Sequence, residues 1–81
     1  MPNILVCDDE RDIVSALKIY LTAEGYEVFT AYDGMEAVRV TEEKEVHLIL
    51  MDIMMPVMDG VEAVSRIRQK YNVPIIFLSA K

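Results

Sequence analysis

The chain has 81 residues, 53% of them hydrophobic, and its 14 acidic and 8 basic side chains give a formal net charge of −6 at pH 7. This length and composition predict one small globular domain, residues 1–81. The acidic balance argues against direct nucleic-acid contact, which depends on clustered lysine and arginine, and favours a cation or a basic partner. No charged-then-apolar leader opens the chain, and no apolar run approaches the roughly 20 residues of a membrane span. We therefore expect a cytoplasmic protein without membrane contact.

The first half of the chain alternates short apolar runs with a helical pattern. Residues 3–7 form a continuous apolar run, typical of a parallel strand covered on both faces, and Cys7 within it is expected to act as a small buried hydrophobic residue. Residues 10–23 repeat apolar side chains at helical spacing, and Gly25 follows as a stop signal. Residues 26–30 fit a strand at the edge of a sheet.

Two more helices are predicted in the second half from a capping pattern, an aspartate followed three residues later by a glutamate. The pattern occurs at Asp33 and again at Asp59. Each predicted helix is followed by an apolar run of strand length, and the run at 47–51, like that at 3–7, is expected to be buried on both faces. The predicted elements of this half are, in order, helix 33–43, strand 47–51, helix 59–71 and strand 74–78.

This βαβαβαβ order with short connections predicts an α/β fold with a parallel sheet and right-handed crossovers. The doubly wound strand order for such a start is 2-1-3-4, which leaves the first helix alone on one sheet face and the other two on the opposite face. In such sheets ligands bind beyond the carboxyl ends of the strands, where the order reverses. Asp8 and Asp9 follow the first strand and Asp52 follows the third, so we expect three carboxylates in one crevice.

Carboxylates a few ångströms apart repel one another unless one is protonated or a cation neutralises them. A hard divalent cation with oxygen ligands, above all Mg2+, suits such a crevice. His47 is the only histidine and starts a strand away from the crevice, so no Cys/His cluster favours zinc. The plainer alternative is that Asp8 and Asp9 cap the first helix, but a cap needs one carboxylate, not two together with Asp52.

With these features the chain resembles the receiver domain of a two-component response regulator, which has a three-layer flavodoxin-like fold. The resemblance covers all 81 residues. It is carried by an apolar strand before Asp8-Asp9, an apolar strand before Asp52, the segment Met55-Pro56-x-Met58-Asp59-Gly60, and Leu78-Ser79-Ala80.

The resemblance implies a signalling domain rather than an enzyme, in a two-component phosphorelay. Asp52 would accept a phosphoryl group from the phosphohistidine of a sensor histidine kinase. Asp8, Asp9, Asp52 and the backbone carbonyl of Met54 would hold Mg2+, and the hydroxyl of Ser79 would hydrogen-bond the phosphoryl group. Family members are often joined to a DNA-binding output domain, which implies a parent protein that regulates transcription. An aspartate-nucleophile phosphohydrolase is disfavoured, because its usual second aspartate would fall at Met54.

The chain departs from the family after its fourth predicted strand. The family fold has five strands and five helices, so we expect a truncated (βα)3β unit that lacks the fourth helix, the fifth strand and the fifth helix. The lysine that ends the fifth strand in the family and contacts the phosphoryl group would be missing as well. Lys81 does not match that lysine. The strand at 74–78 carries no charge to protect an edge, and much of one sheet face would be bare, which predicts a homodimer through that face or edge. The alternative function is therefore a truncated or engineered half-receiver that self-assembles without phosphotransfer.

Overall fold

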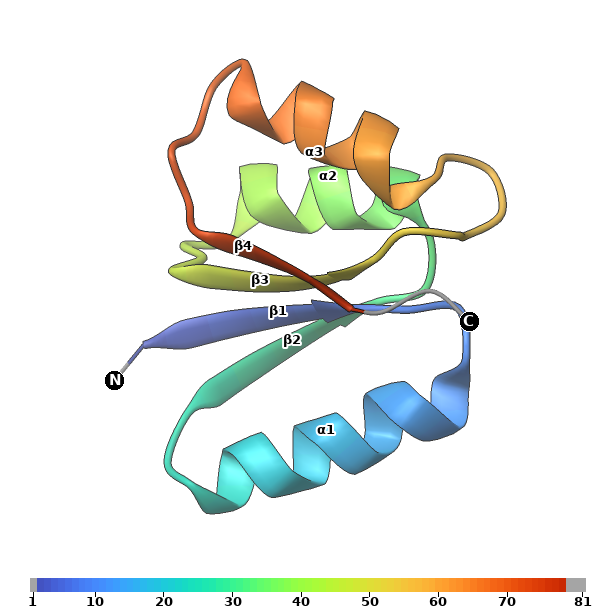
Figure 1. The fold of residues 1–81 in the computed structure, drawn as a ribbon. Helices are drawn as coiled ribbons and strands as arrows, with labels where there is room; N and C mark the ends of the chain where they lie inside the picture. Colours follow the sequence, from blue (N-terminus) through green and yellow to red (C-terminus); the bar gives the residue numbers. More distant parts are fainter. Residues whose placement is uncertain (1, 79–81) are drawn as a thin grey trace.

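A four-stranded parallel sheet forms the middle layer of the computed structural model, which describes residues 2–78 (Figure 1). The strand order is β2-β1-β3-β4, as the sequence predicted. The reversal lies between β1 and β3, where Cys7 is paired with Met51. The carboxyl ends of these two strands are therefore neighbours. The strands are β1 (Asn3–Cys7), β2 (Glu27–Ala31), β3 (Leu48–Asp52) and β4 (Ile75–Leu78).

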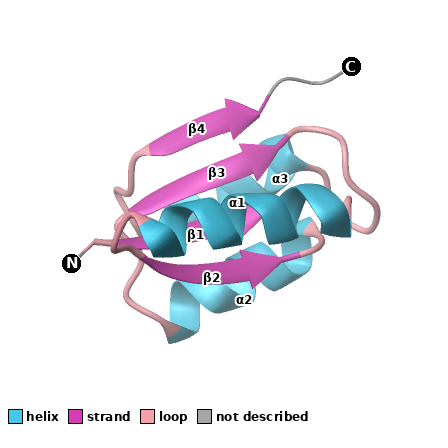
Figure 2. Ribbon diagram, turned by 90° about the horizontal axis from the view of Figure 1, so that it is seen from below, coloured by secondary structure: helices cyan, strands magenta, loops and turns pink. Residues whose placement is uncertain are grey.

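Helices cover the two faces of the sheet unequally. Helix α1 (Arg11–Ala23) lies alone on one face, whereas α2 (Gly34–Glu43) and α3 (Gly60–Arg68) lie together on the other (Figures 1 and 2). This is the three-layer, flavodoxin-like arrangement predicted from the alternating elements. None of the helices within residues 2–78 has both the length and the apolar character needed to cross a membrane.

Both predicted capping patterns are confirmed. The Asp33 carboxylate accepts the backbone N–H of Glu36 at 2.8 Å, and the Asp59 carboxylate accepts that of Glu62 at 2.9 Å. Glu36 also reaches back, and its carboxylate accepts the N–H of Tyr32 at 2.8 Å. The two aspartate bonds satisfy backbone donors that the first turn of a helix leaves without intrahelical partners, and so they fix where α2 and α3 begin.

Every element except β1 begins one residue later than predicted, and two boundaries have a clear physical cause. Strand β2 starts at Glu27 rather than at 26, because the N–H of Tyr26 donates to the Leu21 carbonyl (3.1 Å) and belongs to the turn that closes α1. Gly25 in this turn has a φ of 97°, a conformation that favours glycine. Helix α3 ends at Arg68 rather than near Tyr71. The chain must become extended ahead of Pro74, and residues 69–71 form a turn instead of a further helical turn.

The main core lies between the sheet and the α2–α3 layer. On the α1 side only three side chains of the described chain are fully buried: Ile4, Val6 and Val14. The expectation that the third strand is buried on both faces is wrong, because α1 packs on β1 and β2 and leaves Leu48 and Leu50 half-buried. The main core is built from Leu5, Cys7, Ala31, Ala37, Val46, Ile49, Met51, Met58, Ala63 and Ile67.

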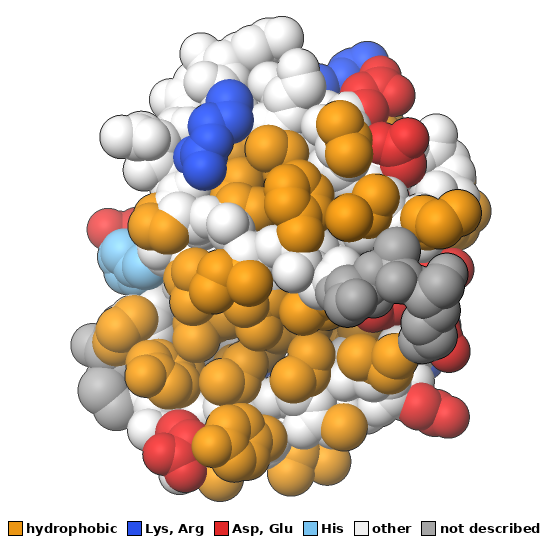
Figure 3. Space-filling model, viewed as in Figure 1, with side chains coloured by type: hydrophobic (Ala, Val, Ile, Leu, Met, Phe, Trp, Pro, Cys, Tyr) orange, Lys and Arg blue, Asp and Glu red, His pale blue; other side chains and the backbone are white. Residues whose placement is uncertain are grey.

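The β4 edge is the least covered part of the sheet in the described chain. Ile76 is 55% exposed and Phe77 is 43% exposed, although both are apolar strand residues. Figure 2 shows β4 beyond the part of the sheet that α1 covers. Figure 3, in the view of Figure 1, shows apolar side chains gathered across the middle of the molecule, between α3 and α1. Within residues 2–78, the β4 edge therefore has the apolar exposure that the sequence predicted.

Candidate functional site

Three carboxylates meet at the carboxyl ends of β1 and β3. Asp8 and Asp9 follow β1, and Asp52 is the last residue of β3. One oxygen from each of the three side chains lies within 4.8 Å of the others. Asp52 is more than 40 positions away from Asp8 and Asp9 in the chain, and the parallel pairing of β1 with β3 brings them together. The convergence follows from the strand order, as expected.

Asp8 is the most deeply placed of the three, with only 5% of its surface exposed. Its N–H donates to the Ala31 carbonyl of β2 at 3.1 Å, and its carboxylate accepts the N–H of Glu10 at 2.9 Å. The residue thus ties β1 to β2 and also holds the chain that enters α1, since Glu10, the N-cap residue, makes no side-chain cap of its own. Asp8 is not the cap of α1, because the N-cap is Glu10; its bond to the Glu10 N–H shapes the turn ahead of the helix.

The surroundings of Asp8 disfavour its negative charge. Burial raises the pKa of this carboxyl, and the charges of Asp52 and Asp9 raise it further, while the hydrogen bond from Glu10 acts in the opposite direction. The single hydrogen bond from Glu10 does not offset the cost of burying the Asp8 charge among other carboxylates. A bound cation would offset this cost, and so the electrostatics of the cluster favour a positively charged ligand.

Cys7 lies one residue before this cluster, and its thiol is chemically quiet. The side chain is fully buried, and its Sγ lies 3.4 Å from the Met55 Sδ and 3.5 Å from the Asp33 carbonyl oxygen. Burial, followed by the nearby carboxylates, raises the pKa of the Cys7 thiol to about 12. The thiol is therefore protonated at neutral pH and is neither a nucleophile nor a metal ligand, which agrees with the predicted packing role.

Two glycines allow close backbone approaches that position the loop after Asp52. A Cβ on Gly60 would lie 2.1 Å from the Asp52 carbonyl oxygen, and the Gly60 N–H donates to the Ile53 carbonyl at 2.7 Å. A Cβ on Gly34 would lie 2.2 Å from the Met58 carbonyl oxygen, which accepts the Gly34 N–H at 3.0 Å. No local sequence pattern indicates the contact of Gly34 with this loop, because it joins two segments far apart in the chain.

Val57, in the same loop, has an unusual backbone conformation. Its φ is 69°, and the N–H of Met58 donates to the Pro56 carbonyl at 2.7 Å, which makes a γ-turn centred on Val57. A β-branched residue at positive φ is strained, because its side chain crowds the backbone. The side chain is 80% exposed, so no packing offsets this strain. No sequence signal identified this position.

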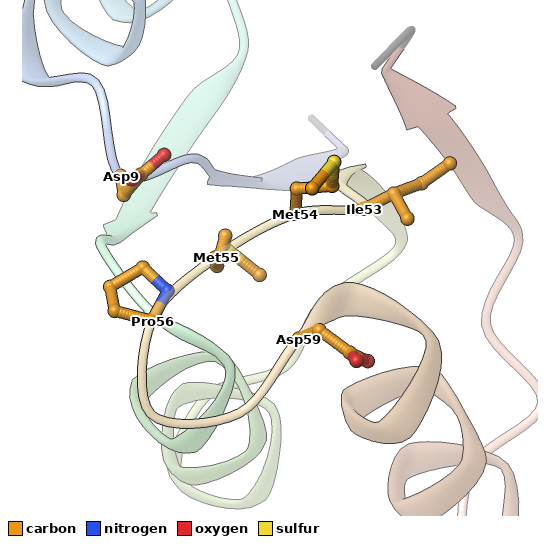
Figure 4. A pocket seen from close by; sticks show the side chains of 6 residues that line it. All are labelled: Asp9, Ile53, Met54, Met55, Pro56 and Asp59. Atoms are coloured by element: carbon orange, nitrogen blue, oxygen red, sulfur yellow. The ribbon is translucent and has the colours of Figure 1, made fainter. Parts of the chain in front are cut away.

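A pocket of about 560 Å3 adjoins the acidic cluster. Figure 4 shows Asp9 on one side of it and the β3–α3 loop on the other. The loop residues that line it include Met54, whose side chain is largely exposed, and Pro56. Asp9 belongs to both the pocket and the cluster, so a molecule in this pocket would lie next to the three carboxylates.

The donor set fits Mg2+. Magnesium prefers oxygen ligands at about 2.1 Å in an octahedron, so two ligand atoms on opposite sides of one ion are about 4.2 Å apart. One oxygen of each carboxylate lies within 4.8 Å of the others, so small side-chain rotations would bring all three within reach of one ion. Met54 lies two residues beyond Asp52, beside the pocket. Ser79 and Lys81 lie outside the described residues.

His47 has a structural environment at the opposite end of the sheet. Its Nδ1 accepts the backbone N–H of Asn3 at 2.9 Å, and its Nε2 lies 3.4 Å from a Glu45 carboxylate oxygen. Asn3 begins β1, whereas the acidic cluster follows the other end of that strand. The prediction that His47 lies away from the crevice is confirmed.

Comparisons with known proteins agree with this fold. The family model of the response regulator receiver domain matches residues 4–81. The response regulator TrrA of Thermotoga maritima, solved in complex with Mg2+ and beryllium fluoride, is 41% identical with a TM-score of 0.92, over 100% of this chain and 71% of that one. A Francisella response regulator receiver domain is 34% identical with a TM-score of 0.93, over 99% and 67% of the two chains.

TrrA has also been solved in complex with the histidine kinase ThkA; that structure is 42% identical with a TM-score of 0.90, over 99% of this chain and 70% of that one. The neighbouring structures are thus longer than this chain, which spans about two thirds to seven tenths of them. The match of the family model covers nearly every residue. The chain belongs to the response regulator receiver domain family.

Proposed function

We propose that this chain is the phosphoryl-accepting domain of a two-component response regulator, with Asp52 as the acceptor. The observation that carries the proposal is the meeting of Asp52 with Asp8 and Asp9 at adjoining strand ends. The 41% identity to TrrA, whose structure contains Mg2+ and beryllium fluoride, supports the proposal. Receiver domains are signalling domains rather than conventional enzymes, and the transfer uses the carboxylate of the domain itself.

In the proposed reaction an oxygen of the Asp52 carboxylate attacks the phosphorus of a phosphohistidine. The P–N bond breaks as a P–O bond forms, the imidazole keeps the electron pair and takes up a proton, and Asp52 becomes an acyl phosphate. Asp8, Asp9, Asp52 and the Met54 carbonyl would hold Mg2+, which would offset negative charge on the acceptor and the transferred group. The Ser79 hydroxyl would donate a hydrogen bond to a phosphoryl oxygen.

The pocket beside the cluster gives the donor a place to approach. The residues that border it are Asp9 and the loop that follows Asp52. The close packing of Gly60 against the Asp52 carbonyl holds the first residues of that loop next to the proposed acceptor. Positioning supplies much of the catalysis in phosphoryl transfer, so this loop is part of the proposed machinery.

The proposed donor is a sensor histidine kinase in the cytoplasm. The ThkA–TrrA complex, of which TrrA is 42% identical to this chain, supports a partner of that class. The acidic charge of −6 disfavours direct contact of this domain with nucleic acid. Regulation of transcription would therefore depend on an output domain of the parent protein.

The test is phosphorylation by a small donor. Folded protein is incubated with Mg2+ and acetyl phosphate, and intact-mass spectrometry measures addition of one phosphoryl group. Asp52→Asn is expected to abolish the modification. Asp33→Asn is the matched control, because asparagine caps a helix as well as aspartate does and Asp33 lies outside the cluster. Unchanged modification of the Asp52→Asn variant would contradict the assignment.

A second candidate function is a self-associating half-receiver without phosphotransfer. The observation that favours it is the exposure of apolar side chains along β4 and on the adjoining sheet face (Figure 3). A homodimer through that face or edge would cover them. The same experiment separates the candidates: a folded, self-associated protein that gains no phosphoryl group with Mg2+ and acetyl phosphate would favour the second.

A further inference from the structure

Asp9 is the member of the acidic cluster that the sheet holds least directly. Asp52 ends β3, and the N–H of Asp8 donates to the Ala31 carbonyl of β2 at 3.1 Å. Asp9, in contrast, is exposed and lies in the turn between β1 and α1. The place of its carboxylate therefore depends on the path of this turn, and so on where α1 begins.

Arg11, the first residue of α1 and two positions beyond Asp9, contacts an aromatic ring. Its guanidinium carbon lies 3.9 Å from the centre of the Tyr32 ring. A cation over a ring face is attracted by the π electrons when it lies within about 6 Å of the ring centre. The Arg11 contact is well inside this limit, whereas Lys44 lies 5.9 Å from the centre of the Phe29 ring. The Arg11 side chain is thus stacked on Tyr32.

Tyr32 is held in place by its backbone and by its ring. It follows β2 directly, and its N–H donates to the Glu36 carboxylate at 2.8 Å. Its half-buried side chain packs against the small core on the α1 side of the sheet, which consists of Ile4, Val6 and Val14. The stack therefore ties the first residue of α1 to the carboxyl end of β2, the strand that pairs with β1.

The stability of α1 alone does not explain a positive charge at its start. The N-terminus of a helix carries partial positive charge, so a cation in the first turn is unfavourable there. Helix α3 follows the favourable arrangement, with Arg66 and Arg68 in its last turn. No ion pair joins Arg11 to an acidic side chain within residues 2–78. The contact with the Tyr32 ring is therefore the interaction that offsets this cost.

We propose that Arg11 is a positioning residue of the acidic site: its stack on Tyr32 holds the β1–α1 turn so that Asp9 shares one cation with Asp8 and Asp52. The inference rests on the magnesium site of the proposed function and adds a residue that does not itself bind the ion. It predicts an effect opposite in sign to that of charge alone. Removing a positive charge near a cation site reduces repulsion and should strengthen Mg2+ binding, whereas loss of the stack should weaken it.

The first test measures Mg2+ affinity by isothermal titration calorimetry. Arg11→Ala removes the charge and the stack, and we expect binding about fivefold weaker, a fold-change equivalent to about 1 kcal/mol, the size of a partly exposed cation–π contact. Lys18→Ala is the matched control, because Lys18 is an exposed cation on the same helix and its loss leaves the stack intact. The affinity of this control should stay the same or rise slightly. Stronger binding by Arg11→Ala would overturn the proposal.

The second test removes the stack without changing any charge. Tyr32→Leu keeps an apolar side chain against the core but has no aromatic face, so it should weaken Mg2+ binding as Arg11→Ala does. Tyr32→Phe keeps the ring face and should retain wild-type affinity. The double variant with Arg11→Ala and Tyr32→Leu should bind no more weakly than either single variant, because both substitutions remove the same contact. Full additivity of the two losses would show that they do not act through the stack.

The third test observes the turn itself, without a metal. In EDTA, amide hydrogen exchange is measured at Glu10, whose N–H donates to the Asp8 carboxylate at 2.9 Å. Glu62 is the internal control, because its N–H makes an equivalent bond to the Asp59 carboxylate at the start of α3. Tyr32→Leu is expected to speed exchange about fivefold at Glu10 and to leave Glu62 unchanged. Equal acceleration at both sites would indicate general destabilisation and would contradict a local role.

The calorimetric outcomes separate this inference from the proposed function. A wild type that does not bind Mg2+ would overturn the magnesium site and this role of Arg11 together. Wild-type binding that is unchanged in both Arg11→Ala and Tyr32→Leu would overturn the role of Arg11 alone and leave the acidic site as proposed.

Discussion

The acidic end of the sheet and its β4 edge are both unfavourable in an isolated chain, but for opposite physical reasons. At the acidic end, three carboxylates share a region within 4.8 Å, and one of them, Asp8, is buried. At the edge, as far as residues 2–78 show, β4 pairs only with β3 and apolar side chains such as Ile76 are exposed. Charge repulsion is relieved by a cation, whereas apolar exposure is relieved by another surface.

The two regions also differ in how firmly the fold builds them. The three carboxylates lie at the ends of the central strands β1 and β3, which pair with each other. The close packing of Gly60 against the Asp52 carbonyl holds the following loop in place. Strand β4 is only four residues long and is paired on one side. The acidic site is therefore arranged before a ligand binds, whereas β4 is held among the described residues only by its pairing with β3. The predictions below test this contrast, from the largest expected effect to the smallest.

Gly60→Ala tests how firmly the acidic end is built. The new Cβ would overlap the Asp52 carbonyl oxygen, so α3 or the end of β3 must shift. We expect a loss of about 3 kcal/mol in the free energy of unfolding, at the upper end for an overpacked position. Urea denaturation followed by circular dichroism measures it. Ser65→Ala, at an exposed site on the same helix, is the control and should change stability by less than about 0.5 kcal/mol. Equal effects of the two substitutions would contradict the close packing of Gly60 against the Asp52 carbonyl.

Asp8→Asn tests the electrostatic side of the comparison. Asparagine keeps an oxygen that can accept the Glu10 N–H, but it removes the buried charge. Without divalent cations we expect the free energy of unfolding at neutral pH to rise by about 1 kcal/mol, a common size for single substitutions. With Mg2+ the wild type should gain stability and the variant should not. Thermal unfolding with EDTA and with Mg2+ measures both effects, and a less stable variant in EDTA would contradict the argument.

The pH dependence of the wild type has a defined sign. Because the pKa of Asp8 is raised in the folded protein, the folded state takes up this proton more readily than the unfolded chain. The contribution of Asp8 to stability is therefore fully present below its unfolded pKa and is lost as the pH rises through its folded pKa. In EDTA, the stability difference between the Asp8→Asn variant and the wild type should shrink as the pH falls through that range. A difference that grows on acidification would contradict the assigned shift.

Val57→Gly is expected to have the smallest effect, and it stabilises. Glycine adopts a φ of 69° without strain, and the exposed valine side chain contributes no packing. Relief of strain outweighs the greater backbone entropy of glycine, for a net gain of about 0.5–1 kcal/mol. Val61→Gly is the matched control in the first turn of α3, where the same substitution should destabilise by about 0.5–1 kcal/mol. Effects of the same sign would show that Val57 is not strained.

The parts of the structure that the sequence predicted correctly depend on local patterns or on the strand order. The caps at Asp33 and Asp59 follow from a four-residue signature, and the meeting of Asp52 with Asp8 and Asp9 follows from the 2-1-3-4 order. Neither needs detailed side-chain packing. Both features could therefore be read before any coordinates were known.

The parts that the sequence did not predict depend on contacts between distant segments. Leu50 looks like a fully buried strand residue, but its exposure is decided by how far α1 extends over the sheet. The contact of Gly34 with Met58 joins two loops, and the positive φ of Val57 arises from the path between two fixed ends. Apolar periodicity and capping signatures carry no information on such contacts.

The most direct test of the account is Mg2+ binding by the 81-residue chain, measured by isothermal titration calorimetry. The account predicts one Mg2+ per chain, with binding lost in both Asp9→Asn and Asp52→Asn, because the two aspartates share a single ion from separate strands. Asp12→Asn is the control; Asp12 is an exposed acid in the first turn of α1, outside the cluster, and its substitution should leave binding nearly unchanged. Wild-type affinity in Asp52→Asn, or an equal loss in Asp12→Asn, would contradict the claim that these three carboxylates form one site.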